Sequence, residues 1–294
     1  MANEASSQTI TIQLVRSFTQ DAQSGSPTGI VLNADHLGEA PMQRIAQELN
    51  FAETAFVQTA KHADVKLRFF APNHEVALCG HATIATFHLL LERGDIVLKN
   101  GRPKTLIQET RAGELAVTCH ADGRIVMAQS PPVFGDIEQD RTLIADLLGV
   151  SAEDFVPNLP LQVVSTGTPK LIIPFKSATR LRAIKPDLER IKEYCWRTEA
   201  KGFYPFTSDT PIPDSDFYAR QFNPLADENE DPITGVAAGA LGCYSEKYQL
   251  LPRATCTVAQ GYDLDMGGLM YVDTTKSVRV GGYAVTTGTT TITL

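Results

Sequence analysis

The sequence of 294 residues contains few cysteines, no surplus of basic residues and no long apolar run. The five cysteines are widely spaced and include no C-x-x-C pair, which argues against a disulfide framework and favours a reducing, cytoplasmic environment. Lys and Arg number 26 against 34 Asp and Glu, a net charge of −8, so we expect neither a nucleic-acid-binding surface nor an anionic-membrane surface. The longest apolar runs, such as residues 171–173, fall far short of the roughly 20 residues that span a bilayer. Residues 1–8 lack the basic and apolar regions of a signal peptide.

Several functional motifs are also missing. There is no G-x-x-x-x-G-K-[ST], no strand-linked G-x-G-x-x-G and no G-x-S-x-G, which disfavours nucleotide cofactors and a serine-hydrolase site. His74, Cys79, His81 and His88 raise the possibility of zinc, but no C-x-x-C or H-E-x-x-H completes a ligand set. We therefore expect neither a cofactor nor a resident metal.

The composition that is present predicts a globular chain with a sizeable core, since 43% of the residues are hydrophobic and 20% are charged. At about 150 residues per domain, the length suggests two domains. The periodicity of apolar residues predicts strands at 9–15, 51–57 and 65–70, and helices at 41–50, 82–92, 186–196 and 236–243. Two of these helices, over 82–92 and 236–243, are apolar nearly all round, so we expect each to be buried with sheet about it.

An internal repeat is visible in two pairs of short segments. Residues 68–72 and 220–224 share three of five residues at an offset of 152, and Gly25-x-Pro27-x-x-Ile30 is echoed by Gly167-x-Pro169-x-x-Ile172 at an offset of 142. In each half, strands are followed by an acidic turn and an apolar helix. The sequence therefore predicts two similar halves with a site between them.

Continued without a gap, the offset of 152 places Glu75 opposite Asp227, and Cys79 opposite Asp231. Cys79 and Asp231 each stand at the predicted start of an apolar helix. A helix N-terminus has unpaired N–H groups and a partial positive charge, so both starts are suited to binding a carboxylate. We expect a small anion to be held by the following residues: Cys79, Gly80, Ala82, Thr83, Thr234, Gly235 and Val236.

Each candidate for chemistry also has a structural interpretation. Cys79, close to His81 at a helix N-terminus, is either a reactive thiol or a buried structural one. Asp231 is either a ligand-binding acid or an N-cap followed by Pro232 at the first helical position. Glu53, placed among apolar residues of the predicted strand 51–57, is either a desolvated general base or an edge residue that reaches water.

Five blocks of the sequence together resemble the PhzF-like family, the phenazine-biosynthesis-type isomerases that share the diaminopimelate epimerase fold. The resemblance spans most of the chain. The blocks are Gly25-Ser-Pro-Thr-Gly29, the segment from Met42 to Val57 with Glu53-Thr-Ala-Phe56, Arg68-Phe-Phe-x-Pro72, Leu78-Cys-Gly-His-Ala-Thr83 and Glu230-Asp-Pro-x-Thr-Gly235.

The resemblance implies an α+β fold of two similar halves, each a barrel-like, mostly antiparallel sheet around a central apolar helix, with the active site in the cleft between them. The implied domains are residues 1–130 with a C-terminal strand at about 284–294, and residues 131–283. It also implies catalytic roles for three residues: Glu53 as the acid/base that moves a proton, and His81 and Asp231 as groups that hold and orient the substrate.

The sequence departs from the family pattern at two positions. Ser26 replaces the usual Asn of G-N-P-x-G, and Val236 replaces the small polar residue that often follows D-P-x-T-G. In the related epimerases and racemases, cysteines occupy the positions that the offset assigns to Cys79 and Asp231. A mechanism with two thiols is therefore unavailable to this chain.

These observations lead to the hypothesis of a cofactor-independent, cytoplasmic isomerase that acts on a small anionic metabolite and forms a homodimer. Glu53 removes a proton from carbon and returns it elsewhere, and the helix N-termini hold the carboxylate. One alternative is an epimerase or racemase that uses Cys79 with Glu53 or Asp231 as the second base. An alternative of another class is a metabolite-binding protein without catalytic activity.

Overall fold

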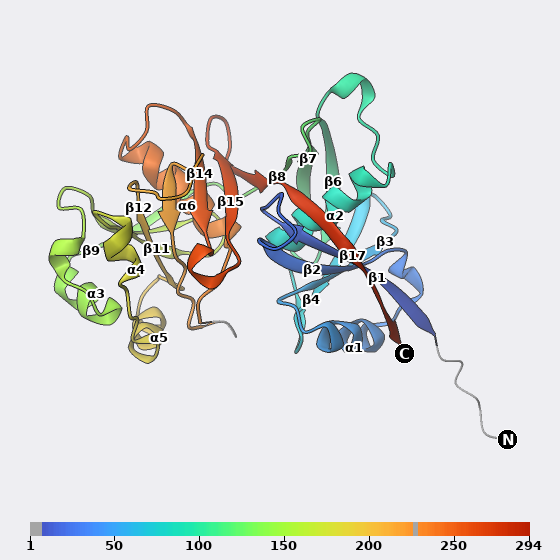
Figure 1. The fold of residues 1–294 in the computed structure, drawn as a ribbon, viewed down its shortest axis with the longest axis horizontal. Helices are drawn as coiled ribbons and strands as arrows, with labels where there is room; N and C mark the ends of the chain where they lie inside the picture. The colour runs from blue at the N-terminus through green and yellow to red at the C-terminus, as the bar shows by residue number, and fades with distance from the viewer. Residues whose placement is uncertain (1–7, 226–228) are drawn as a thin grey trace. The chain divides into compact units, whose positions relative to one another are not determined.

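The computed structural model describes residues 8–225 and 229–294. The chain divides into two compact units (Figure 1). Unit 1 comprises the N-terminal part up to residue 22 with residues 26–127 and 283–294, and unit 2 comprises residues 23–25 and 128–282. Both units combine strands with a few helices, so the fold is of the mixed α+β class. Among the described residues, no helix is both long and apolar enough to cross a bilayer.

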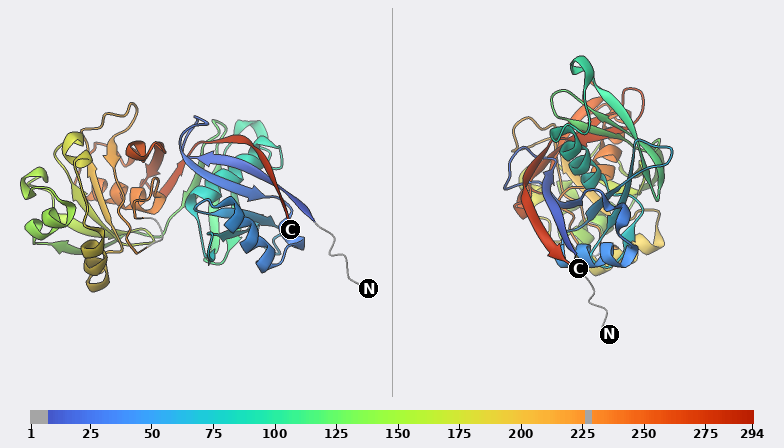
Figure 2. Two further views of the ribbon diagram at one scale, coloured as in Figure 1. Left: turned by 60° about the horizontal axis from the view of Figure 1, so that its bottom comes forward. Right: turned by 90° about the vertical axis from the view of Figure 1, so that its right-hand side faces the viewer.

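The sheet of unit 1 is mostly antiparallel. Its strands are β1 (Thr9–Ser17), β2 (Ser26–Val31), β3 (Thr54–Gln58), β4 (Val65–Phe70), β5 (Glu75–Val76), β6 (Lys104–Thr110), β7 (Gly113–Cys119), β8 (Ile125–Ala128) and β17 (Ala284–Thr293). β1 pairs antiparallel with both β2 and β17, and the antiparallel pairs β3–β4, β4–β5, β6–β7 and β7–β8 follow. The parallel pairs β2–β3 and β4–β6 connect these segments. In Figures 1 and 2 the red β17 runs beside the blue β1.

Two helices complete the described part of unit 1, together with the short 3-10 helices η1 (Ala34–His36) and η2 (Lys99–Gly101). α2 (Gly80–Glu92) contacts β1, β2, β3, β7 and β17, and seven of its thirteen residues are buried. α1 (Glu39–Leu49) buries one apolar face and stops at Asn50, whose left-handed backbone (φ 52°) forms the predicted C-terminal stop. α1 begins two residues before Pro41, since proline is accepted anywhere in the first turn.

Unit 2 contains the remaining strands of the part of the chain that the structure describes. Its strands are β9 (Val133–Glu138), β10 (Leu161–Ser165), β11 (Lys170–Pro174), β12 (Phe203–Thr207), β13 (Phe217–Ala219), β14 (Thr255–Gln260), β15 (Gly268–Asp273) and β16 (Arg279–Gly282). Neighbours in this order pair antiparallel, except that β11–β12 and β13–β14 are parallel. Its helices are α3 (Arg141–Leu148), α4 (Ala178–Arg182), α5 (Leu188–Arg197) and α6 (Gly235–Lys247), with 3-10 helices η3 (Ala152–Asp154) and η4 (Tyr262–Leu264).

α6 packs closely against the sheet of unit 2. It contacts β10, β11, β14, β15 and β16, and nine consecutive residues, 237–245, are buried. A Cβ atom on Gly242 would lie 2.5 Å from Val272 Cγ1, so glycine is what allows the helix to approach β15 this closely. The apolar sequence of this helix reflects the burial of residues 237–245, and that of α2 the burial of its middle, residues 82–87.

The structure contains a local repeat, one copy in each unit. The Arg68 guanidinium donates two hydrogen bonds, of 2.7 and 2.8 Å, to the Glu75 carboxylate. Arg220 donates two hydrogen bonds to Glu230 in the same way, both of 2.8 Å. Each guanidinium also lies over the ring of the phenylalanine two residues further on, at 5.0 and 4.8 Å. The second glutamate is followed by α6 at the same interval as the first is followed by α2.

This repeat corrects the gapless alignment. The partner of Glu75 is Glu230 and not Asp227, which lies outside the described residues. The residue before α6 that matches Cys79 is Thr234 and not Asp231, because each is the N-cap of its helix. Three extra residues in the second acidic turn shift the offset from 152 to 155, and a gapless count has no means of detecting them.

Candidate functional site

Glu53 lies between α1 and β3, one residue before the strand begins. The prediction that the strand starts at residue 51 is wrong, because α1 ends in the left-handed residue Asn50 and residues 51–53 redirect the chain into the sheet. Glu53 therefore belongs to no strand face. Its side chain is 23% exposed, and its Oε2 lies 3.2 Å from His81 Nε2.

Cys79 and His81 are brought to Glu53 by the start of α2. Cys79 is the N-cap residue of this helix, with extended backbone (φ −136°, ψ 121°), and it is buried. Its Sγ lies 3.5 Å from His81 Nδ1 and 3.6 Å from His81 Nε2. A carboxylate, an imidazole and a thiol from two segments of unit 1 thus meet at one place.

The other predicted residues at this helix start are mainly structural. The hydroxyl of Thr83 lies 2.8 Å from the carbonyl oxygen of Cys79 and 3.3 Å from Gln108 Oε1, so it fixes the first turn. Ala82 is fully buried. What this turn, from Gly80 onward, offers an anion is its backbone N–H groups and the positive end of the helix dipole.

Asp231 does not begin a helix, and that prediction is wrong. α6 starts only after Thr234, and the Asp231 carboxylate holds the preceding turn: Oδ1 accepts from the Ile233 N–H (3.1 Å) and Oδ2 from the Thr234 hydroxyl (2.6 Å). Gln260 Nε2 donates to the Asp231 carbonyl at 2.7 Å. Short-range capping of the turn outcompetes a helical conformation for an Asp-Pro sequence.

The start of α6 is also fixed by a residue that sequence reasoning missed. The Thr166 hydroxyl lies 3.0 Å from the Val236 carbonyl and 3.0 Å from Gln129 Oε1. A Cβ on Gly239 would lie 3.0 Å from the same hydroxyl, so glycine leaves it room. A sequence feature that could have indicated Thr166 is the similarity between Gly25-x-Pro27 and Gly167-x-Pro169, because Thr166 directly precedes the second of these segments.

A second missed residue is Lys170 on β11, whose side chain is almost fully buried. Its Nζ donates to the Lys201 carbonyl at 3.3 Å. Burial lowers the pKa of Lys170 to about 8, against the opposing effect of the negative charge on Asp231 and of Cys195. A lysine in a run of apolar strand residues gave no signal in the sequence, since burial of an ammonium depends on the tertiary structure.

Replacing Lys170 by Met should therefore change how stability depends on pH. Because the pKa in the folded state is below its unfolded value, the unfolded chain binds the proton more tightly, and wild-type stability rises from pH 8 towards pH 10. The free energy of unfolding of Lys170→Met relative to that of the wild type should fall by about 2 kcal/mol between pH 7 and pH 10. Urea unfolding at several pH values measures this, with the exposed Lys176→Met as the control. A difference in the free energy of unfolding that is the same at both pH values would contradict the buried ammonium.

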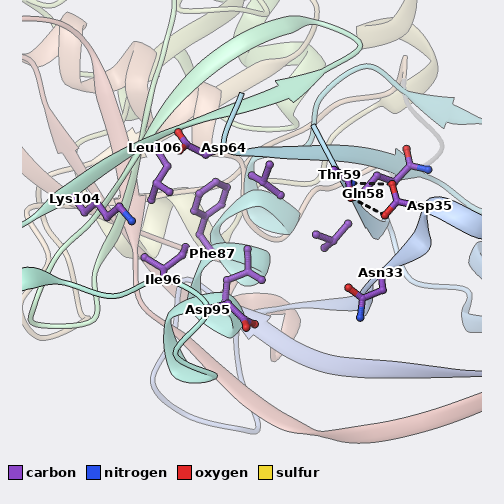
Figure 3. A pocket seen from close by; sticks show the side chains of 13 residues that line it. Asn33, Asp35, Gln58, Thr59, Asp64, Phe87, Asp95, Ile96, Lys104 and Leu106 are labelled. Atoms are coloured by element: carbon purple, nitrogen blue, oxygen red, sulfur yellow. Dashed lines mark hydrogen bonds between the residues drawn. The ribbon is translucent and has the colours of Figure 1, made fainter. Parts of the chain in front are cut away.

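A hollow of unit 1 lies away from these residues. It has a volume of about 390 Å³, with Phe87 and Leu106 among its apolar walls and Asp35 and Asp64 among its polar ones (Figure 3). Asp35 accepts hydrogen bonds from the N–H and hydroxyl of Thr59, and Asp64 accepts one from the backbone, so both carboxylates are engaged within the fold. None of the predicted site residues is among the described residues that line it.

Comparison with known proteins identifies the family. The sequence model of the PhzC-PhzF family, described as phenazine biosynthesis-like protein, matches residues 15–290. The chain belongs to this family. The PhzC-PhzF match is supported by the "Uncharacterized isomerase YfhB" of Bacillus subtilis, which is 36% identical over 260 residues that cover 87% of each chain. The predicted family is confirmed, and membership makes this chain an enzyme of the isomerase class.

Solved structures of the PhzC-PhzF type agree with this assignment. The Bacillus anthracis phenazine biosynthesis protein of the PhzF family superposes with a TM-score of 0.87 at 30% identity, covering 97% of this chain and 99% of that one. A hydroxyproline epimerase from Agrobacterium vitis, with bound trans-4-hydroxy-L-proline, gives a TM-score of 0.63 at 12% identity over 98% of this chain and 92% of that one. The second likeness shows that the PhzC-PhzF fold is shared with epimerases.

Proposed function

We propose that this chain is a cofactor-independent isomerase that moves a proton within a small carboxylate-bearing metabolite, with Glu53 as the base. The observation that supports this most is the contact between Glu53 Oε2 and His81 Nε2 at 3.2 Å, with 23% and 12% of the two side chains exposed. A carboxylate that is neither fully solvated nor bound by an arginine can accept a proton from carbon and return it.

His81 complements this base. One imidazole nitrogen lies against the carboxylate, where this contact orients Glu53 in the proposal, and an imidazole can also stabilise the negative charge that develops as the proton leaves. The N–H groups at the start of α2 supply a site for the substrate carboxylate. General-base catalysis contributes about 10²–10⁴-fold, so electrostatic stabilisation must supply most of the remaining acceleration.

The finer parts of the hypothesis are proposals as well. They comprise the domains 1–130 with 284–294 and 131–283, each a barrel-like sheet around a central helix, a homodimer, and a cytoplasmic location. Asp231, Thr234, Gly235 and Val236 are proposed to orient or bind the substrate. The hydrogen bonds that Asp231 makes to its own turn support a positioning role for this residue, since they fix the start of α6.

Incubation with a panel of small carboxylates in deuterated water tests the function. We expect a change in the proton spectrum that moves a hydrogen or a double bond, with weak incorporation of deuterium because one base carries the proton. Deuterium at the stereocentre of recovered substrate would favour an epimerase or racemase. Tight binding of a carboxylate without turnover or exchange would favour a metabolite-binding protein.

Replacing Cys79 by Ser should lower turnover by less than about a hundredfold. The position that matches Cys79 in unit 2 is Thr234, so the chain lacks the second thiol of a two-thiol exchange. Steady-state kinetics on the substrate found in deuterated water measures the effect. A larger loss, above roughly 2.7 kcal/mol of transition-state stabilisation, would support the epimerase alternative.

A further inference from the structure

The meeting point of Glu53, Cys79 and His81 has the composition of a metal site. The three donor atoms all lie within 4.8 Å of one another. His81 Nε2 is 3.2 Å from Glu53 Oε2 and 3.6 Å from Cys79 Sγ. No group of this kind is present at any other place in the part of the chain that the structure describes.

The spacing of the donor atoms is close to that around a tetrahedral ion. Ligand atoms bound to Zn²⁺ at about 2.0–2.3 Å lie roughly 3.3–3.8 Å from each other when the geometry is tetrahedral. The imidazole–carboxylate distance of 3.2 Å lies just below this range. Cys79 Sγ lies 3.6 Å from His81 Nε2 but also 3.5 Å from Nδ1, so the Cys79 side chain must turn before its sulfur and Nε2 can share an ion. The thiol and the carboxylate lie within 4.8 Å, a gap that rotation of the Cys79 side chain about its Cα–Cβ bond can close.

We propose that Glu53, Cys79 and His81 bind one Zn²⁺ ion through three protein ligands, with the fourth position open to water or a carboxylate. Thiolate, imidazole and carboxylate are the ligands that zinc selects, whereas Mg²⁺ and Ca²⁺ prefer oxygen alone. The ion is an inhibitor and not a cofactor, because it occupies the lone pair with which Glu53 accepts the proton. This inhibition rests on the proposed function, but the binding does not.

The position of Cys79 distinguishes it from the other thiols. A helix N-terminus stabilises a thiolate, and Cys79 is the N-cap of α2. Burial raises the pKa of Cys119 and Cys195 to about 11, and that of Cys243 and Cys256 to about 12. None of these four thiols belongs to a group of three candidate ligands in the described part of the chain.

Spacing in the sequence does not show this site, because only two of its ligands, Cys79 and His81, are close together in the chain. Cys79 and His81 supply two ligands at the start of α2, and the third comes from the turn before β3. β3 enters the sheet beside β2 and β4, and α2 contacts β2 and β3, so the pairing of strands in unit 1 brings the third ligand into place.

Direct titration of metal-free protein with Zn²⁺ against a chromogenic chelator tests the proposal. We expect one ion per chain, and at least about a hundredfold weaker binding in Cys79→Ser and in His81→Asn, since even outer groups around a metal cost 10–100-fold when removed. The matched control is Cys119→Ala, which removes another thiol of unit 1 and should bind Zn²⁺ as the wild type does. Titration with Co²⁺ should give a thiolate charge-transfer band that Cys79→Ser lacks.

The absence of Zn²⁺ binding to the wild type at micromolar concentration would overturn the proposal. Unchanged Zn²⁺ binding in Cys79→Ser and His81→Asn would also overturn it, once circular dichroism has shown that both variants are folded. Addition of Zn²⁺ should also abolish turnover, and a chelator should restore it. Full turnover with the ion bound to these three residues would contradict the role of Glu53 as base while leaving the metal site intact. The two proposals therefore fail separately.

Discussion

Replacing Glu53 by Gln should lower kcat by about 10²–10⁴-fold with little change in stability or in binding of the substrate carboxylate. Gln has nearly the same shape and keeps an oxygen that can face His81 Nε2, which lies 3.2 Å from the Glu53 carboxylate, but it cannot take a proton from carbon. The helix N-terminus that binds the carboxylate in this proposal is unaltered. Kinetics, ligand titration and thermal unfolding of the same preparation measure the three quantities.

A matched control is Glu48→Gln on α1. Glu48 is also a glutamate of unit 1, but it is exposed and paired with Arg44, so its substitution should leave kcat within about twofold. If Glu53→Gln retained a rate near that of the wild type, Glu53 would not be the base and Asp231 would be the next candidate. A loss of kcat accompanied by unfolding would be settled by Glu53→Asp, which keeps the carboxylate.

Replacing Gly261 by Ala should destabilise the protein by about 2–5 kcal/mol. Gly261 has a left-handed backbone (φ 84°), and a Cβ would lie 2.6 Å from the Pro232 carbonyl oxygen and 2.8 Å from that of Met266. The backbone conformation costs an alanine roughly 1–2 kcal/mol and the overpacking roughly 1–3 kcal/mol. Because Pro232 belongs to the turn held by Asp231, activity should fall together with stability.

Gly94→Ala separates the two causes. Gly94 has nearly the same φ, 80°, but a Cβ there would meet nothing within 4 Å, so only the conformational cost of roughly 1–2 kcal/mol applies. Urea unfolding of both variants gives the comparison. Equal losses of stability would show that the carbonyl oxygens around Gly261 move aside, and the predicted disturbance of the Asp231 turn would then be wrong.

Much of the fold could be predicted from periodicity. The alternation at 9–15 lies within β1, Asn50 ends α1, and the two helices without a polar face are buried over most of α6 and the middle of α2. These features depend on local patterns that burial imposes directly. The start of β3 was misplaced because residues 51–53 are as apolar as the strand that follows.

The candidate site was less accessible to sequence reasoning. Cys79 and His81 share one turn, and their proximity follows from spacing. Their contact with Glu53 depends on the path of the sheet, and the role of Asp231 in its own turn depends on three extra residues that a gapless repeat overlooks. The burial of Lys170 is invisible until neighbouring strands are in place.

The pairing of β1 with β17 has a consequence for biosynthesis. Thr9 lies opposite Thr293, so the strand that completes unit 1 is translated after every strand of unit 2. Until then one edge of β1 lacks its partner and offers a template for aggregation. Domains commonly fold in the order of their translation. Here all strands of the segment from 128 to 282 are synthesised before β17, the last strand of unit 1. We therefore expect a chain that stops before β17 to leave β1 without this partner in the unit that carries Glu53 and His81.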